Sequence, residues 1–405
     1  MKQLFADPLH EQLGTWPLAY IPYGGADYGE IVRIAEEVGE GDDSAFHAAW
    51  TNAAERLAGE AAEALARGHH AGARELYLRA ACFHAKAFQP LFGEPVDPRL
   101  VSSFRQQMEA FDAALALGDE PSAPLRIPFE QTTLPAYLIG AAGRASEVRP
   151  LIIFTNGYDG AMTDMYFASA VAASRRGYHA LIFEGPGQGE MLIEHGLRMR
   201  PDWETVVGAV VDYVLTLPNV DAKRIALNGW SLGGYLAPRA ASGEHRLAAC
   251  IADPGQSDIT VGLRALAVKF GATPEAAAHL GELDAGVVDR MGQFFMADRK
   301  LRWTMVQRAP WVHGAPSLRE YLQLIEAFTM AGRAERIRCP TLVTLAEDDP
   351  IARSAQALFD DLRCQRTLVR FTAEQGASSH CEMGNRSRLN RVTLDWLDEV
   401  MAGSA

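Results

Sequence analysis

The sequence predicts an α/β protein whose central sheet is mainly parallel and is covered by helices on both faces. From about residue 125 onward, short apolar runs alternate with stretches of helical character such as "DWETVVGAVVDYVLTL". Continuous apolar strands that alternate with helices indicate a buried parallel sheet. Each run ends in polar residues or glycine, at the strand ends where such sheets bind ligands. Two strand candidates in "LRIPFEQTTLPAYLIGA" come first, and the runs that follow are "RPLIIFTNGYDG", "YHALIFEGPGQG", "RIALNGWSLGG", "RLAACIADPG", "CPTLVTLAEDD" and "RTLVRFTAEQG".

The N-terminal part of the chain, residues 1–122, is expected to form a separate helical region. Apolar residues recur at steps of three or four in "SAFHAAWTNAAERLAGEAAEALARG", which indicates an amphipathic helix that ends near Gly68. A second helix is expected in "AGARELYLRAACFHAKAF". The third is expected in "DPRLVSSFRQQMEAFDAALALG", with Asp97 as its N-cap and Pro98 in its first turn. One helical hairpin is too little for a solenoid, so we interpret this region as an appendage.

The core is expected to occupy residues 123–405, with one interruption. The segment between Pro254 and Cys339 is far longer than one crossover helix requires, and it is rich in helix formers and large apolar residues. A plain loop of this length and character is uncommon. We therefore expect a helical cap, at about 257–337, inserted over the strand ends.

Composition and charge argue against several classes of function. The formal net charge of −13 is unsuited to sequence-independent binding of nucleic acid or of anionic membrane surfaces. The chain has 5 cysteines and no CxxC pair, which indicates reduced thiols rather than disulfides or a zinc site. The first residues lack the apolar run of a signal peptide, and no stretch approaches the length of a membrane span. The expected location is the cytoplasm.

The strand candidate "RIALNGW" leads directly into a Gly-x-Ser-x-Gly motif formed by Gly229, Ser231 and Gly233. Between a strand and a helix, this motif is the nucleophile elbow of the α/β-hydrolase fold. The turn is sharp enough to require glycine two residues before and after the serine, and it exposes the serine hydroxyl at the top of the sheet. The alternative is a glycine-rich turn with a capping serine. The position before "YLAPRAA" favours Ser231 as a nucleophile.

A serine hydroxyl needs a base, and the base needs an acid that fixes its tautomer. In this fold the chain order is serine, acid, histidine. We predict that His380, in the loop "EQGASSHCEMGN", is the base rather than a surface or core histidine. Asp349 is favoured as the acid because the turn "AEDDP" should aim its fourth residue inward. Asp348 is the near alternative, and Asp253 is the more remote one.

The developing oxyanion requires preorganised donors. The Leu232 N–H is one candidate, and the other is the Tyr158 N–H in the loop "TNGYDG", where Gly157 allows the backbone to approach. A turn that merely needs glycines is the alternative. Asp159, Trp230 and Asp253 are candidate substrate contacts.

Two other motifs are not expected to bind a cofactor or a metal. The loop "FEGPGQGEM" spaces its glycines as GxGxG rather than GxGxxG, and Pro186 removes one N–H that would face a phosphate. A turn that shapes the rim of the pocket is the better interpretation. His69 and His70 have no partner ligands nearby in the sequence, so we expect no metal site and no cofactor.

The chain resembles one branch of the α/β-hydrolase superfamily over roughly residues 40–400. The motifs that carry the resemblance are "DGAMTDMYF", "FEGPGQGE", "PDWE", "VDYV", "RIALNGWSLGGYLAPRAA" and "CIADPG". This branch contains dihydroxypseudooxynicotine hydrolase and the fungal pigment hydrolases that shorten polyketide chains. The resemblance implies a serine hydrolase that cleaves a carbon–carbon bond next to a ketone in an aromatic or polyketide-like small molecule. It places nucleophile, acid and base at Ser231, Asp349 and His380, and it implies a lid-forming and dimer-forming N-terminal region, hence a homodimer.

Other activities on the same scaffold stay open at this stage. The same residues would cleave an ester, as in a general carboxylesterase. A cap that excludes water would favour an acyltransferase or a cyclase. A ligand-binding protein without catalysis is less favoured, since a receptor need not keep serine, acid and histidine in order. In each case the expected partner is a small molecule, with neither nucleic acid nor membrane.

Overall fold

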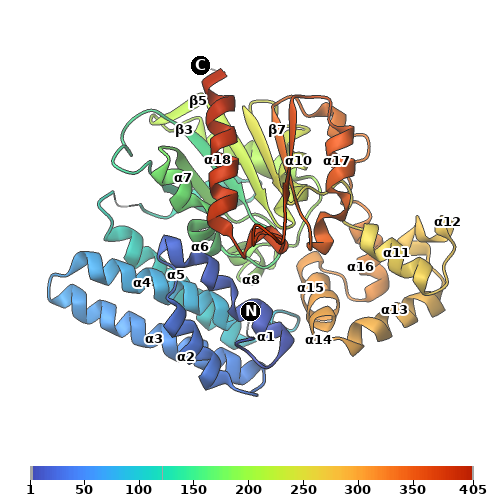
Figure 1. Ribbon diagram of the computed structural model, residues 1–405, viewed down its shortest axis with the longest axis horizontal. Coiled ribbons are helices and arrows are strands. Elements are labelled where there is room, and N and C mark those ends of the chain that lie inside the picture. The colour runs from blue at the N-terminus through green and yellow to red at the C-terminus, as the bar shows by residue number, and fades with distance from the viewer. Residues whose placement is uncertain (1–2, 121, 404–405) are drawn as a thin grey trace.

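The computed structural model describes residues 3–120 and 122–403. It has a central sheet with helices on its faces and two further groups of helices at one end of the sheet (Figure 1). In Figure 1 the N-terminal helices lie below the sheet on the left, and the helices inserted between β6 and β7 lie below it on the right. The C-terminal helix α18 (Arg386–Gly403) runs in front of the sheet. In these residues no helix combines the length and the apolar character needed to cross a bilayer.

The sheet has eight strands in the order β1-β2-β4-β3-β5-β6-β7-β8. The first two strands pair antiparallel, β2 also pairs antiparallel with β4, and all other neighbours are parallel. The predicted mainly parallel α/β sheet is therefore confirmed. The strands are β1 (Leu125–Phe129), β2 (Thr132–Ile139), β3 (Arg149–Thr155), β4 (His179–Phe183), β5 (Val220–Trp230), β6 (Ala249–Asp253), β7 (Thr341–Ala346) and β8 (Arg366–Phe371).

The central strands are buried on both faces, as their continuous apolar sequences require. Every residue of β4 and of β6 is buried, so helices must cover both sides of the sheet. Helix α10 (Gly233–Ala241) packs against β5, β6 and α9 (Trp203–Val214), while α18 packs against β6 and α7 (Val171–Arg175). This packing fixes the strand ends that carry the candidate site residues.

The N-terminal region is helical, and its three predicted helices are present as α3, α4 and α5. Asp97 caps α5 as predicted, because its side chain accepts a hydrogen bond from the Arg99 N–H. The short helix η1 was not predicted, because its sequence "WPLAYIPY" contains two prolines and no helical period of apolar residues. The helices of this region are α1 (Pro8–Gly14), η1 (Trp16–Tyr23), α2 (Tyr28–Val38), α3 (Asp43–Ala66), α4 (His70–Ala87), η2 (Gln89–Leu91) and α5 (Pro98–Ala116).

The segment between β6 and β7 is also helical, and it touches the N-terminal region. The Trp303 ring stacks on Phe92 with ring centroids 6.0 Å apart, and the Trp303 Nε1–H donates to the Gln89 carbonyl at 3.0 Å. The two groups of helices thus form one continuous cover below the sheet. The inserted helices are α11 (Val261–Lys269), α12 (Pro274–Ala277), η4 (Leu280–Glu282), α13 (Ala285–Ala297), α14 (Arg299–Leu301), η5 (Arg302–Arg308), α15 (Ala309–His313), α16 (Leu318–Ile325) and η6 (Ala334–Arg336).

Candidate active site

Ser231 lies in a sharp turn between β5 and α10, and its backbone has a φ of +61°. This left-handed conformation is strained for a residue with a side chain. A Cβ atom at position 229 would lie 1.8 Å from the Gly233 carbonyl oxygen, which explains the first glycine of the motif. The turn is held by two hydrogen bonds, from the Ser231 N–H to the Asp253 carbonyl and from Gln256 Nε2 to the Ser231 carbonyl, both at 2.7 Å.

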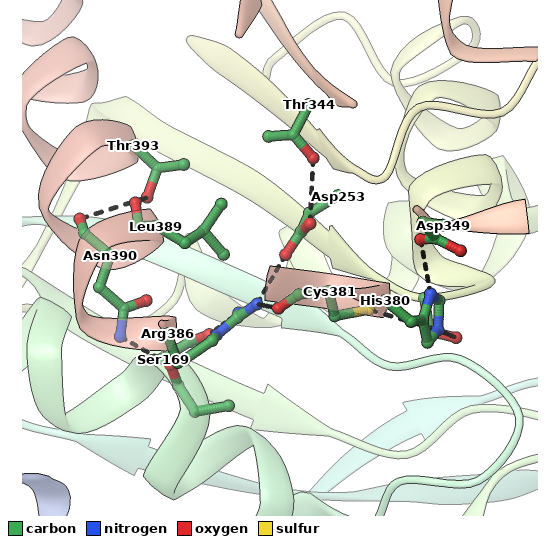
Figure 2. A network of polar contacts seen from close by, with 12 residues as sticks. Ser169, Asp253, Thr344, Asp349, His380, Cys381, Arg386, Leu389, Asn390 and Thr393 are labelled. Carbon is green, nitrogen blue, oxygen red and sulfur yellow. Dashed lines mark hydrogen bonds and ion pairs between the residues drawn. The ribbon is translucent and has the colours of Figure 1, made fainter. Parts of the chain in front are cut away.

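The structure brings Ser231, His380 and Asp349 into one hydrogen-bonded row. Ser231 Oγ lies 2.9 Å from His380 Nε2, and His380 Nδ1 lies 2.7 Å from Asp349 Oδ2. The second pair is visible in Figure 2. The Asp349 side chain is fully buried, and its other oxygen accepts the Ile351 N–H at 2.9 Å. This arrangement lets the carboxylate hold Nδ1–H while Nε2 accepts the serine proton.

Opposing effects act on the pKa of His380. Burial disfavours the charged imidazolium and lowers the pKa, but the neighbouring Asp349 carboxylate raises it by charge and by hydrogen bonding. The net pKa lies above the ordinary value of 6.5. His380 is therefore tuned toward holding a proton that it has accepted from the serine.

The other two candidate acids are placed differently. Asp348 is exposed, and its backbone N–H donates to the Ser378 carbonyl at 2.9 Å. Asp253 is 1% exposed, and its oxygens bind Arg386 Nη1 at 2.8 Å and the Thr344 hydroxyl at 3.0 Å. Figure 2 shows this carboxylate turned toward Arg386 rather than His380. Both oxygens of Asp253 are thus engaged inside the protein, which corrects the expectation of a substrate contact there.

The backbone after His380 is also strained, and Arg386 holds it. Cys381 and Glu382 have φ values of +52° and +51°. Arg386 Nη1 donates to the Cys381 carbonyl at 2.9 Å, while Nε and Nη2 bind the Ala168 carbonyl and the Ser169 hydroxyl. This guanidinium is buried, so its hydrogen bonds fix the loop that carries the histidine (Figure 2). No local pattern in the sequence indicates this role for Arg386, because arginines in helices are mostly solvated.

The loop after β3 lies against the serine turn. A Cβ atom at position 157 would lie 2.8 Å from both the Leu232 nitrogen and Ser231 Cβ, so only glycine fits there. Among the described residues, neither the Leu232 N–H nor the Tyr158 N–H donates a hydrogen bond to another protein atom. Two unused donors beside a nucleophile are what an oxyanion hole requires.

The glycine-rich loop after β4 braces this candidate oxyanion hole. Gln188 Nε2 donates to the Asn156 carbonyl at 2.7 Å and to the Gly157 carbonyl at 3.3 Å. Glu184 accepts the Met162 N–H at 3.1 Å and the Glu190 N–H at 2.7 Å, and burial raises its pKa to about 7. The contribution of Gln188 was missed, although the unusual glycine spacing around it was the available signal. Across 3–120 and 122–403, no group of three or more metal-ligating side chains is clustered.

The side chains of the loop after β3 reach the inserted helices. The Tyr158 hydroxyl lies 2.6 Å from His313 Nε2, and the Arg308 guanidinium stacks 4.6 Å above the Tyr158 ring. Burial, together with the Arg308 charge, lowers the pKa of His313 to about 3, so this histidine is neutral. Asp159 forms an ion pair with Arg308. It also borders a small cavity lined by aromatic residues, among them Phe88, Phe92, Phe104, Tyr158 and Trp311.

Two tryptophans lie near the candidate site, and one of them adjoins the imidazole. Trp230 is buried, with its ring 5.5 Å from the Arg386 guanidinium, so it is packed into the floor below the site. Trp16 of η1 is partly exposed, and its ring centroid lies 5.3 Å from that of Trp230 and 6.2 Å from that of His380. Trp16 was missed because nothing in a short proline-containing segment indicates a contact with the far end of the chain.

Comparison with known proteins gives a consistent result. Residues 152–390 match the model of the alpha/beta hydrolase family. The chain is 33% identical to hydrolase acrC of Aspergillus aculeatus, over 94% of each chain. It is 30% identical to the 20-hydroxy-prefusarin hydrolase of Gibberella moniliformis, over 95% of this chain and 94% of that one. A crystal structure of 2,6-dihydroxy-pseudo-oxynicotine hydrolase superposes with a TM-score of 0.73 at 22% identity, over 95% of both chains.

Proposed function

The chain belongs to the alpha/beta hydrolase family and is a hydrolase. We propose that it is a serine hydrolase that cleaves the carbon–carbon bond next to a ketone. Ser231 is the nucleophile, His380 the base and Asp349 the acid. The observation that carries the proposal is the row of contacts from Ser231 Oγ to His380 Nε2 at 2.9 Å and from His380 Nδ1 to Asp349 Oδ2 at 2.7 Å.

In the first step, Ser231 Oγ adds to the carbonyl carbon while His380 Nε2 takes the hydroxyl proton. The buried Asp349 carboxylate stabilises the imidazolium that forms. The negative charge on the carbonyl oxygen is held by the Leu232 and Tyr158 N–H groups. Removing one such donor costs about 10²- to 10³-fold in rate in enzymes of this kind.

In the second step, the tetrahedral adduct collapses and the bond to the leaving carbon breaks. The leaving carbon departs as an enolate or an electron-rich arene and takes the proton from His380. Water, activated by the same histidine, then attacks the acyl-enzyme and releases the acid. An ester would follow the same route with an oxygen leaving group.

The proposed substrate class is an aromatic or polyketide-like small molecule. Support comes from the aromatic cavity beside the candidate oxyanion loop and from the relative named for 20-hydroxy-prefusarin. We further propose that residues 1–122 act as a lid and that the helices at about 257–337 act as a cap. The stack of Trp303 on Phe92 and the hydrogen bond from Trp303 to the Gln89 carbonyl support a joint role for the lid and the cap, because these contacts join the two parts. A homodimer in the cytoplasm remains a prediction from the sequence.

The nucleophile is tested with a fluorophosphonate probe. The wild-type protein should be labelled at Ser231, and Ser231→Ala should not. Ser242→Ala is the matched control, because Ser242 caps the end of the same helix α10 and its hydroxyl donates to the Arg239 carbonyl at 2.7 Å. An unlabelled wild type would contradict the proposal.

The bond specificity is tested with an aryl β-diketone and an aryl ester that carry the same acyl group. Mass spectrometry should detect the carboxylic acid and the ketone from the diketone. Release of acid from the ester alone would reduce the proposal to a carboxylesterase.

A further inference from the structure

The N-terminal helix η1 brings an aromatic ring to the catalytic imidazole. We propose that Trp16 is a specificity-determining residue whose ring forms the wall against which the leaving group of the substrate packs, and that it selects flat, conjugated leaving groups. The proposal rests on the proposed function, since it assigns the leaving group to the His380 side of the site.

Three groups at the candidate site are partly exposed. Ser231, His380 and Trp16 each retain exposed surface, while the neighbouring Trp230, Leu232 and Asp349 are buried. The Trp16 and His380 ring centroids lie 6.2 Å apart, with their planes inclined by 46°. Trp16 therefore lies beside the imidazole and retains part of its surface accessible.

The direction of proton transfer decides which part of the substrate meets this ring. His380 Nε2 takes the proton from Ser231 and must return it to the leaving atom. The leaving group has to lie beside the imidazole when the bond breaks, and the centroid of the Trp16 ring lies 6.2 Å from that of the imidazole. A planar group gains more from packing on an indole face than a puckered ring of the same size.

The ring is held firmly enough to act as a wall. The Lys86 ammonium lies 5.9 Å from the Trp16 centroid, is fully buried, and pairs with Asp164 at 2.9 Å. Asp164 also accepts the Tyr20 hydroxyl at 2.8 Å and the Ala161 N–H at 3.0 Å. One buried carboxylate thus ties η1 to α4 and to the end of the candidate oxyanion loop.

A matched pair of substrates tests the proposal. The phenyl and cyclohexyl esters of one carboxylic acid have six-membered leaving groups of similar size, of which one is flat and the other puckered, and they also differ in intrinsic reactivity. For each ester, the ratio of kcat/KM in the variant to kcat/KM in the wild type cancels the intrinsic reactivity of that ester. The ratio therefore reports the contact between the leaving group and residue 16. Trp16→Leu should lower kcat/KM for the phenyl ester by about tenfold and for the cyclohexyl ester by less than about twofold.

Two further variants calibrate the result. Trp16→Phe keeps a smaller aromatic ring and should lower kcat/KM for the phenyl ester by only about two- to threefold. Trp396→Leu is the control, because Trp396 is also partly buried but lies in α18, where its Nε1–H donates to Thr367 at 3.2 Å. Trp396→Leu should leave kcat/KM for both esters unchanged.

Labelling with the fluorophosphonate separates the possible failures. Trp16→Leu should be labelled at Ser231 like the wild type, and equal losses on both esters, or no loss on either, would then overturn the proposal. If Trp16→Leu does not fold, the same comparison is decided by Trp16→Phe, for which an equal loss on both esters is the contradicting result. A wild type that is neither labelled nor active on either ester contradicts the proposed function, and this proposal falls with it.

Discussion

Two buried carboxylates follow neighbouring strands of the sheet, and they have different partners. Asp349 follows β7 and faces the His380 imidazole, whereas Asp253 ends β6 and faces the Arg386 guanidinium. Figure 2 shows the two pairs side by side. Both Asp253 and the Asp349 side chain are almost completely excluded from solvent.

The difference teaches that the partner decides what a buried carboxylate does. A guanidinium keeps its proton at any working pH, so the pair of Asp253 with Arg386 is fixed in charge. An imidazole gains and loses a proton near neutrality, so the pair of Asp349 with His380 can take part in a reaction. The first pair fixes the shape of the His380 loop, and the second is proposed to do the chemistry.

Glu382 adds a third carboxyl group beside the fixed pair. It is fully buried and lies beside Asp253, whose charge and side-chain hydrogen bond both act on it. Burial raises its pKa first, and the negative charge of Asp253 raises it further. The raised pKa thereby favours the protonated, neutral form of Glu382.

The largest effect is expected when the pair of Asp349 with His380 is broken. Asp349→Asn should lower kcat on a phenyl ester by about 10⁴-fold, because an amide cannot hold the Nδ1–H tautomer of His380. The steady-state rate is measured beside that of Asp253→Asn. A rate within tenfold of the wild type in Asp349→Asn would remove the distinction between the two carboxylates.

The next largest effect is expected when the pair of Asp253 with Arg386 is broken. Asp253→Asn leaves the buried Arg386 charge without its counterion, and it should lower the free energy of unfolding by about 3–5 kcal/mol. Urea unfolding measures this loss. The double variant Asp253→Asn with Arg386→Met should recover part of it, because no unpaired charge remains. An unchanged unfolding midpoint in Asp253→Asn would contradict a structural role.

The pH dependence separates the two pairs by the size of the shift, since both carboxylates raise the pKa of His380. The wild-type kcat/KM should fall in acid as His380 takes up a proton, with an apparent pKa above the ordinary 6.5. Asp349→Asn removes the negative charge that raises this pKa, so the acidic limb of its residual activity should move to lower pH. Asp253→Asn should move it in the same direction by less, since Asp253 contributes less to the shift. A limb that stays in place in Asp349→Asn would exclude His380 as the titrating group.

The smallest effect is expected at the neighbouring aspartate. Asp348→Asn changes an exposed side chain, so the rate should stay within about twofold and the free energy of unfolding within about 0.5 kcal/mol. Both are measured beside Asp349→Asn. A large loss of activity would move the acid role to Asp348.

Much of the fold was predictable because its signals are local. The six apolar runs from "RPLIIFT" to "RTLVRF" correspond to β3 through β8. The helical character of α3, α4 and α5 was visible in the sequence, as was the N-cap Asp97 of α5. The same holds for the elbow, since a turn with glycines around Ser231 is a local requirement. The roles of Ser231, His380 and Asp349 as catalytic residues stay predictions, although the structure brings them together.

The remaining features depend on contacts between distant parts of the chain. Trp16 meets His380, and Arg386 meets Asp253, only after the sheet and both groups of helices have assembled. Neither residue is marked by a period or a motif in its own segment. The sequence around Asp253 favoured a role at the site because a strand ends there, but the guanidinium that engages this carboxylate comes from α18.

The origin of Trp16 in the N-terminal region has a practical consequence for protein engineering. The ring beside the imidazole belongs to residue 16, far along the chain from the nucleophile at 231 and the base at 380. A mutagenesis library confined to η1, or an exchange of this helix with that of a relative, alters the wall while leaving the serine and histidine loops untouched. For the same reason, an affinity tag is better attached at the C-terminal end of α18, which Figure 1 shows on the opposite side of the molecule.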